Sequence, residues 1–205
     1  QRLGYETAHI GKWHMGNDGK PRPGYDTWVS YDGHGKLVDP VLNHDGRYRS
    51  HKGHITDIMN DLAVDFLKKK RAKPFSLFFA HKAVHPDAEQ AADGTLTISA
   101  QGGYVAAERH RNLYRNAIFP KKPNMLAPRE LVKQAPAWAE AFEMRAAEPS
   151  RRLLAAIQAG TQEEIRQRAR MMAAVDEGVG LLLAALERAG KLDDTLILFL
   201  GDNGY

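Results

Sequence analysis

The stretch Gly11-Lys12-Trp13-His14-Met15-Gly16 places an ammonium group and an imidazole two residues apart, between two glycines. In an extended segment, side chains at positions i and i+2 point to the same face, so Lys12 and His14 would aim at one spot. A fixed cation beside a titratable imidazole can hold an anionic ester and move a proton near neutral pH. The alternative is a glycine-bounded turn that carries two exposed polar residues.

Two further polar clusters follow apolar runs of strand length. His81-Lys82-Ala83-Val84-His85-Pro86 comes directly after residues 75–80, and Asp202-Asn203-Gly204 comes after residues 195–200. Continuous apolar runs of this length are typical of strands covered on both faces in a parallel sheet. Ligand sites of such sheets lie beyond the carboxyl ends of the strands, so we expect the three clusters to converge there.

The remaining pattern predicts an α/β fold with a mostly parallel sheet between helices. Residues 5–10 are predicted to form a strand, and residues 56–70 a helix with Thr56 as N-cap. Thr161-Gln162-Glu163-Glu164 is a capping-box sequence that opens a second helix, which Gly190 ends. Gly178 and Gly180 suggest close packing of that helix against a strand. Its predicted buried face consists of Ile165, Ala169, Met172, Val175, Val179, Leu182 and Leu186.

Together these motifs resemble the type I sulfatases, which are formylglycine-dependent sulfuric ester hydrolases of the alkaline-phosphatase-like superfamily. Gly-Lys-Trp-His is specific for that family, whereas Asp-Asn-Gly alone is also a common tight-turn sequence. The resemblance covers most of the chain in the family's order: Tyr5-Glu6-Thr7, Gly-Lys-Trp-His, Gly24-Tyr25-Asp26, Phe66-Leu67, Pro74-Phe75, His-Lys-Ala-x-His-Pro, Asp176-x-x-Val179-Gly180 and Thr195 through Asp-Asn-Gly.

The resemblance implies a role for each site residue. Lys12 would bridge the sulfate and the nucleophile, and His14 would accept a proton when sulfate is expelled. His85 would contact the sulfate and protonate the leaving oxygen, with His81 and Lys82 as supporting residues. Asp202 and Asn203 would be two ligands of a divalent cation, usually Ca²⁺ with Mg²⁺ possible, because carboxylate and amide oxygens are hard ligands.

The sequence departs from the family pattern in two ways. Val84 stands where the family usually has proline, and Pro86 follows the histidine without the usual intervening residue. The nucleophile motif, Cys/Ser-x-Pro/Ala-x-Arg, is also missing. The chain has no cysteine, and Glu148-Pro149-Ser150-Arg151 has neither Cys nor Ser two positions before its proline. We therefore expect an interior fragment, with the nucleophile upstream of residue 1 and a second lysine and C-terminal subdomain beyond residue 205, and we expect the isolated fragment to be inactive.

Composition narrows the function classes. The chain has 205 residues, a formal net charge of +4, and no long Lys/Arg run that would indicate a nucleic-acid partner. No apolar run is long enough to span a membrane. The compartment is not decided by the sequence, although the resemblance suggests a periplasmic or secreted protein, and the oligomeric state is open.

Two regions receive no catalytic role. His34, His44, His51 and His54 match no zinc-ligand spacing, so we interpret most of them as exposed loop histidines near the mouth of the cleft. Residues 87–160 are predicted to be an insertion rich in loops. Its basic stretch near Arg109 could face the substrate or be solvated, and residues 128–160 are expected to be helical in pieces.

Three functions remain open. The first is hydrolysis of a sugar or aryl sulfate. The second, within the same superfamily, is a phosphoesterase or phosphonate monoester hydrolase. The third is a non-catalytic relative that binds anionic glycans. The identity of the nucleophile would separate the first two, and its absence from the whole gene would favour the third.

Overall fold

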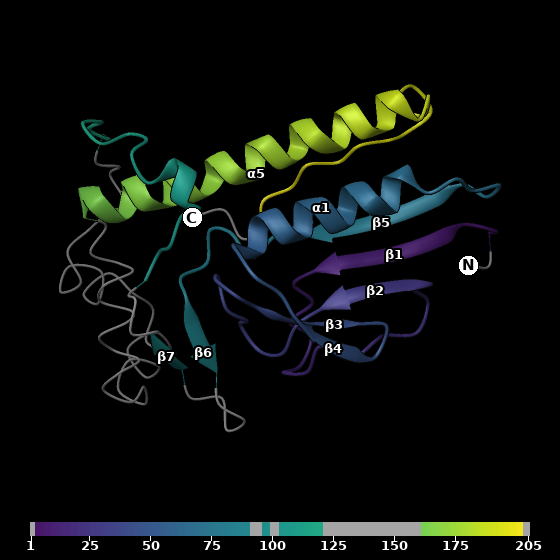
Figure 1. The fold of residues 1–205 in the computed structure, drawn as a ribbon, viewed down its shortest axis with the longest axis horizontal. Helices are drawn as coiled ribbons and strands as arrows, with labels where there is room; N and C mark the ends of the chain where they lie inside the picture. Colours follow the sequence, from purple (N-terminus) through teal and green to yellow (C-terminus); the bar gives the residue numbers. More distant parts are fainter. Residues whose placement is uncertain (1–2, 91–95, 99–102, 121–160, 203–205) are drawn as a thin grey trace, which may run out of the picture.

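The computed structural model describes residues 3–90, 96–98, 103–120 and 161–202. A five-stranded sheet with the order β4-β3-β2-β1-β5 forms its centre (Figure 1). Its strands are β1 (Glu6–Gly11), β2 (Thr27–Ser30), β3 (Val41–His44), β4 (Arg47–Ser50) and β5 (Phe75–Ala80). β1 pairs in parallel with both β2 and β5, whereas β3 and β4 continue the sheet as antiparallel strands. The predicted α/β fold is confirmed, with a parallel half and an antiparallel half in one sheet.

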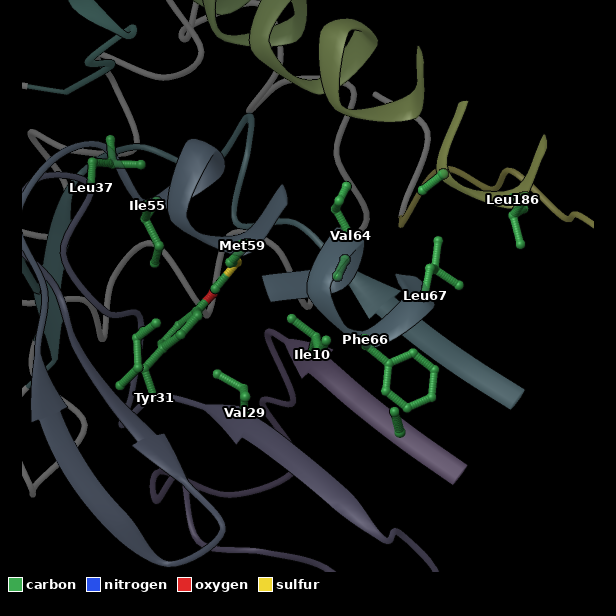
Figure 2. Packing of buried hydrophobic residues seen from close by; sticks show 14 of the residues in the cluster. Ile10, Val29, Tyr31, Leu37, Ile55, Met59, Val64, Phe66, Leu67 and Leu186 are labelled. Carbon is green, nitrogen blue, oxygen red and sulfur yellow. The ribbon is translucent and has the colours of Figure 1, made fainter. Parts of the chain in front are cut away.

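The two long helices form successive layers on one side of the sheet. Helix α1 (Ile55–Lys68) lies on the sheet, and α5 (Gln162–Arg188) packs on α1 (Figure 1). Ile10 and Val29 on the sheet meet Met59 on α1, and Leu186 joins this core from α5 (Figure 2). This arrangement follows from strand alternation, which sends every second side chain of β1 and β2 toward α1.

The opposite side of the central strands carries an aromatic cluster. The imidazole of His9 on β1 stacks on the rings of Trp28 and Phe78, with ring centroids 4.4 and 5.5 Å apart. Trp13 and Tyr25 contact the same imidazole edge to face. Trp13, Tyr25 and Trp28 also pack edge to face on one another, so these three aromatic side chains have a structural role on this side of the sheet.

The start of α1 differs from the prediction. His54, not Thr56, is the N-cap, because its side chain accepts a hydrogen bond from the Thr56 backbone N–H. The other ring nitrogen, Nε2, donates to the Val105 carbonyl oxygen over 2.9 Å. His54 is consequently buried, and the expectation that it is an exposed loop residue was wrong.

Helix α5 begins and ends as predicted, but the residues on its buried face differ from the predicted ones. Thr161 and Glu164 form the capping box, and Gly190 follows the C-cap with a φ of 63°. Gly178 packs against Asn60 of α1 rather than against a strand, and Met172 is exposed. The helix packs mainly on α1 and makes a smaller contact with η1, so its buried stripe is narrow. The buried residues are Arg170, Met171, Ala174, Val175, Gly178, Ala185 and Leu186.

Residues 195–200 do not form the predicted buried strand. They have no regular secondary structure, and Leu196 and Phe199 are 85% and 69% exposed. Within the described residues the sheet ends at β5, where Phe78 is 54% exposed, so β5 is not covered on both faces as expected. A strand needs a neighbouring backbone to complete its hydrogen bonds, and no described strand lies beside residues 195–200.

The described part of residues 87–160 contains small elements. β6 (Ala88–Gln90) and β7 (Leu96–Ile98) pair antiparallel, and the 3₁₀ helix η1 (Glu108–His110) contacts α5. Residues 121–160, including the expected helical pieces from residue 128 and the Glu-Pro-Ser-Arg sequence at 148–151, lie outside the described residues.

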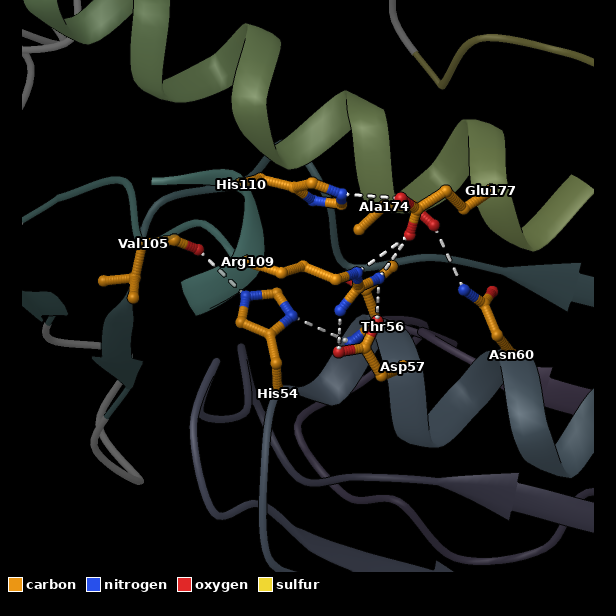
Figure 3. Close-up of polar contacts among 9 residues, drawn as sticks. All are labelled: His54, Thr56, Asp57, Asn60, Val105, Arg109, His110, Ala174 and Glu177. Atoms are coloured by element: carbon orange, nitrogen blue, oxygen red, sulfur yellow. Dashed lines mark hydrogen bonds and ion pairs between the residues drawn. The ribbon is translucent and has the colours of Figure 1, made fainter. Parts of the chain in front are cut away.

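The basic stretch near η1 is engaged in ion pairs (Figure 3). The Arg109 guanidinium donates to both carboxylate oxygens of Asp57 on α1, over 2.7 and 2.8 Å, and its Nε donates to Glu177 on α5 over 2.9 Å. His110 Nε2 contacts Glu177 at 2.7 Å. These contacts favour the structural interpretation of this stretch, because Arg109 ties η1 to the two long helices.

Candidate anion-binding site

The end of β1 approaches β5 so closely that only glycine fits at position 11. Gly11 has a φ of 124°, and a Cβ atom there would lie 1.9 Å from the Ala80 carbonyl oxygen. The next residue continues this contact, since the Lys12 N–H donates to Ala80 over 2.8 Å. The conformation is one that L side chains rarely adopt. It delivers Lys12 to the loop that follows β5.

His14 reaches the site by a different route from the one predicted. Its φ of 47° is left-handed, so the segment is not extended and simple i, i+2 alternation does not apply. Its ring nevertheless lies edge to face with that of His34, with centroids 4.6 Å apart. Left-handed non-glycine residues are strained and are enriched at functional sites.

His34 is the residue that sequence reasoning missed. It is 7% exposed, and its ring stacks on that of His85 with centroids 4.4 Å apart and an interplanar angle of 24°. The interpretation of His34 as an exposed loop histidine was therefore wrong. The available signal was its position: His34 lies in the loop after β2, whose carboxyl end shares one sheet edge with those of β1 and β5.

His81 and Lys82 lie in the same loop as His85, directly after β5. Lys82 is 2% exposed, and its Nζ donates to the carbonyl oxygens of His34 and Pro86 over 2.7 and 3.2 Å. The His81 ring packs against Phe79, with centroids 4.3 Å apart. The supporting roles inferred from sequence for His81 and Lys82 stay predictions. His85, rather than His81, is the histidine that joins the cluster.

Burial lowers the pKa of Lys12, His34, Lys82 and His85, and repulsion by neighbouring cations lowers it further for the last three. Burial is the main cause for Lys82, whose pKa falls to about 8, and for His85, whose pKa falls to about 4. Burial also lowers the pKa of His34 to about 3, with repulsion from His85, Lys12, His14 and Lys82. The pKa of Lys12 is lowered by burial and raised by the Asp202 carboxylate. A bound anion would oppose these effects, so the cluster is suited to anion binding.

The tautomer of His85 follows from one hydrogen bond. Its Nδ1 lies 2.8 Å from the Pro86 carbonyl oxygen, which can only accept, so Nδ1 carries the proton. Nε2 is then the nitrogen available to a ligand. It accepts a proton in the neutral ring and donates one only after the ring has become an imidazolium.

The metal ligands inferred from sequence are described only in part. Electrostatic attraction from the Asp202 carboxylate raises the pKa of Lys12. Asn203 lies outside the described residues. Within the described ranges no group of three or more His, Asp or Glu side chains could hold a metal ion. One carboxylate suits a hard cation but cannot complete its shell.

Comparison with known proteins decides the family. A family model described as Sulfatase matches residues 1–205. The chain belongs to the sulfatase family. An N-acetylglucosamine-6-O-sulfatase of Bacteroides thetaiotaomicron is 28% identical over all of this chain and 43% of its own length. An arylsulfatase of Volvox carteri is 30% identical over all of this chain and 32% of its own length. The chain thus spans less than half the length of these curated relatives.

A solved structure extends the similarity to three dimensions. It is described as a complex with its substrate D-glucosamine-2-N,6-O-disulfate, and it matches 95% of this sulfatase chain and 46% of its own. The TM-score is 0.63 at 25% sequence identity. The family inferred from the Gly-Lys-Trp-His motif is confirmed. None of the helices in the described ranges is long and apolar enough to cross a membrane.

Proposed function

We propose that this chain provides the anion-binding part of a sulfatase active site that hydrolyses a sugar sulfate ester. The observation that carries the proposal is the meeting of Lys12, His14 and His85, which come from loops at one edge of the parallel strands. The similarity to N-acetylglucosamine sulfatases supports a sugar sulfate as substrate. The arylsulfatase relative makes an aryl sulfate the competing choice.

Each residue has a defined task in this mechanism. The Lys12 ammonium binds a sulfate oxygen and stabilises the charge that moves when the S–O bond breaks. His14 accepts a proton as sulfate is released, and His85 donates a proton from Nε2 to the leaving oxygen. His85 must be an imidazolium to do so. The negative charge of bound sulfate counters the two neighbouring lysines and raises the pKa of His85 from about 4.

A sulfatase also needs a nucleophile and a divalent cation. This chain contains no nucleophile motif and only two of the candidate cation ligands. Formylglycine, made from Cys or Ser outside the chain, would supply the nucleophile, and a divalent cation would balance charge on the sulfate. We propose Asp202 and Asn203 as two oxygen ligands of that cation, with Ca²⁺ as the ion and Mg²⁺ as the alternative. The position of Asp202 near Lys12 supports this assignment. A periplasmic or secreted location is also proposed, and fractionation of the source cells would test it.

The test uses the full-length gene product with four substrates. N-acetylglucosamine 6-sulfate and 4-nitrophenyl sulfate are compared with 4-nitrophenyl phosphate and a phosphonate monoester. We expect hydrolysis of the sulfates, with the sugar preferred, and a loss of about 10²–10³ in kcat for Lys12→Ala or His85→Ala. His51→Gln is the matched control, because His51 pairs with His44 and takes no part in the site.

The other outcomes identify the competing functions. Higher kcat/KM for the phosphate or phosphonate ester would assign the phosphoesterase function instead. Salt-sensitive binding of sulfated glycans without any hydrolysis would indicate a non-catalytic relative. The 205-residue chain by itself is expected to be inactive, because it contains no nucleophile motif, and measurable aryl-sulfate turnover by it would contradict that expectation.

A further inference from the structure

The loop that carries His34 is anchored on both sides by segments that border the site. The Gly33 N–H donates to the Asn17 carbonyl oxygen over 2.8 Å, just beyond the Gly-Lys-Trp-His turn. Lys82 Nζ holds the His34 carbonyl oxygen at 2.7 Å, and the Leu37 N–H donates to the Asp87 carboxylate over 2.9 Å. The backbone at His34 is therefore held by the loops after β1 and β5.

The imidazole of His34 lies between two of the proposed catalytic residues. It stacks on His85 at 4.4 Å and meets the edge of His14 at 4.6 Å, measured between ring centroids. Its Nδ1 is buried and has no hydrogen-bond partner among the described residues. Burying an unpaired polar atom costs stability, so packing alone would favour an apolar ring at this position.

We propose that His34 is a positioning residue of the sulfatase site, which fixes the plane of the His85 ring and limits the movement of His14. The inference rests on the proposed function, because it assumes that these two histidines transfer protons. Aromatic stacking sets the orientation of a ring without taking one of its nitrogens. Nδ1 of His85 is already bound to Pro86, so stacking leaves Nε2 free for the leaving oxygen.

The charges around His34 suit this role. Lys12, His14, Lys82 and His85 all face it, and together with burial they lower its pKa to about 3. His34 therefore stays neutral at the pH at which His14 and His85 transfer protons during the reaction. A neutral His34 adds no positive charge that would repel either of them. It also shields His85 from water, which helps to keep the pKa of His85 at about 4.

The test compares His34→Ala, His34→Phe and His34→Gln in the full-length protein. Phe keeps a stacking ring without nitrogens, Gln keeps polar atoms without a ring, and Ala removes both. We expect Ala and Gln to lower kcat by about 10- to 100-fold, the usual effect of misplacing a reacting group, with KM changed less than about 3-fold. Phe should retain kcat within about 3-fold, as should the control His51→Gln.

The pH profile separates positioning from loss of folding. Removing the ring admits water to His85, so its pKa should rise toward the ordinary value of 6.5. Because His85 acts as the protonated general acid, the alkaline limb of the kcat/KM profile should then move to higher pH. His34→Phe should leave that limb in place. If Ala fails to fold by circular dichroism, the contrast between Phe and Gln still decides the question. An unchanged kcat in Gln, or a loss in Phe as large as in Gln, would overturn the proposal.

A second measurement keeps this inference separate from the proposed function. Imidazole ¹⁵N NMR of the full-length protein follows the titration of His85 without any substrate. If the wild-type protein hydrolyses no sulfate ester, the proposed function fails, but a raised His85 midpoint in His34→Gln and an unchanged one in His34→Phe would still support positioning. If the protein is an active sulfatase and the His85 midpoint is the same in all variants, the positioning role alone is refuted.

Discussion

The ammonium nitrogen of Lys82 lies 2.7 Å from the carbonyl oxygen of His34, and this contact joins the loop after β5 to the loop after β2. Lys82 is almost wholly buried, and it also holds the Pro86 carbonyl oxygen. The Lys82 ammonium group therefore binds backbone carbonyl oxygens instead of water. The parallel strands bring the loops to one edge, and this side chain sets how they meet.

Replacing Lys82 with methionine should lower both stability and activity. The change keeps an unbranched side chain but leaves two buried carbonyl oxygens without their donor, at a cost of about 2–3 kcal/mol in the free energy of unfolding. Urea denaturation measures this cost. Lys52→Met is the control, because Lys52 is exposed and pairs with Asp39 at the surface. Equal midpoints for the two variants would show that the Lys82 contacts contribute no stability.

Two glycines of α5 should respond to alanine with opposite signs. At Gly178 a Cβ atom would lie 2.2 Å from Oδ1 of Asn60, whose Nδ2 is bonded to the Ala174 carbonyl oxygen. We expect Gly178→Ala to destabilise the fold by about 1–3 kcal/mol through overpacking. At Gly180 nothing lies within 4 Å, so alanine should stabilise the helix by about 1 kcal/mol. Thermal melts of both variants test the helix–helix contact, and a shift of the same sign in both would argue against it.

Acidification should unfold the protein through its buried histidines. Burial lowers the pKa of His9 to about 4 and that of His81 to about 4, both below the value of 6.5 expected in the unfolded chain. Between pH 6.5 and 4 the unfolded state therefore binds more protons, and stability falls as the pH falls.

The variant His9→Phe isolates one part of this pH effect. Phenylalanine can keep the stacking on Trp28 and Phe78, but it takes up no proton when the chain unfolds. The slope of unfolding free energy against pH should therefore decrease by up to about 1.4 kcal/mol per pH unit in this window. Urea melts between pH 4 and 7.5 supply the slopes, and identical slopes for wild type and variant would mean that His9 titrates normally.

Arg109 should stabilise the fold through the shape of its guanidinium group as well as through its charge. Its bidentate contact with Asp57 and its contact with Glu177 join three segments, and lysine cannot reproduce that fork. Because Arg109 is partly exposed, we expect Arg109→Ala and Arg109→Lys each to cost only about 1 kcal/mol, and less in 1 M salt. Arg111→Ala serves as the control, since Arg111 is exposed and pairs with the nearby Glu108. Full rescue by lysine would show that charge alone matters.

Local signals in the sequence predicted four of the ten described elements, β1, α1, β5 and α5. The strand predicted at residues 75–80 has the bounds of β5, and the capping box at Thr161 opens α5. These features depend on hydrogen bonds and side-chain periodicity within a few residues of one another. The Gly-Lys-Trp-His motif likewise indicated the family and two site residues, because its glycine, cation and imidazole are close together in the chain.

Features that depend on distant neighbours were predicted poorly. Residues 195–200 have the composition of a buried strand, yet strand formation requires a partner backbone, and none of the described strands supplies one. The buried stripe of α5 also differs from the amphipathic pattern, because it is set by the surface of α1. His34 was assigned no role, since its burial depends on loops from β1 and β5.

The sequence by itself determined the family, the parallel strands β1 and β5, and the residue types gathered for anion chemistry, because short-range pattern and motif carry that information. Only the tertiary structure decided that His34 joins His14 and His85, and that Lys82 holds the loops around them. The physical reason is that contacts between side chains far apart in the chain depend on how parallel strands align their carboxyl ends, and no local pattern records that alignment.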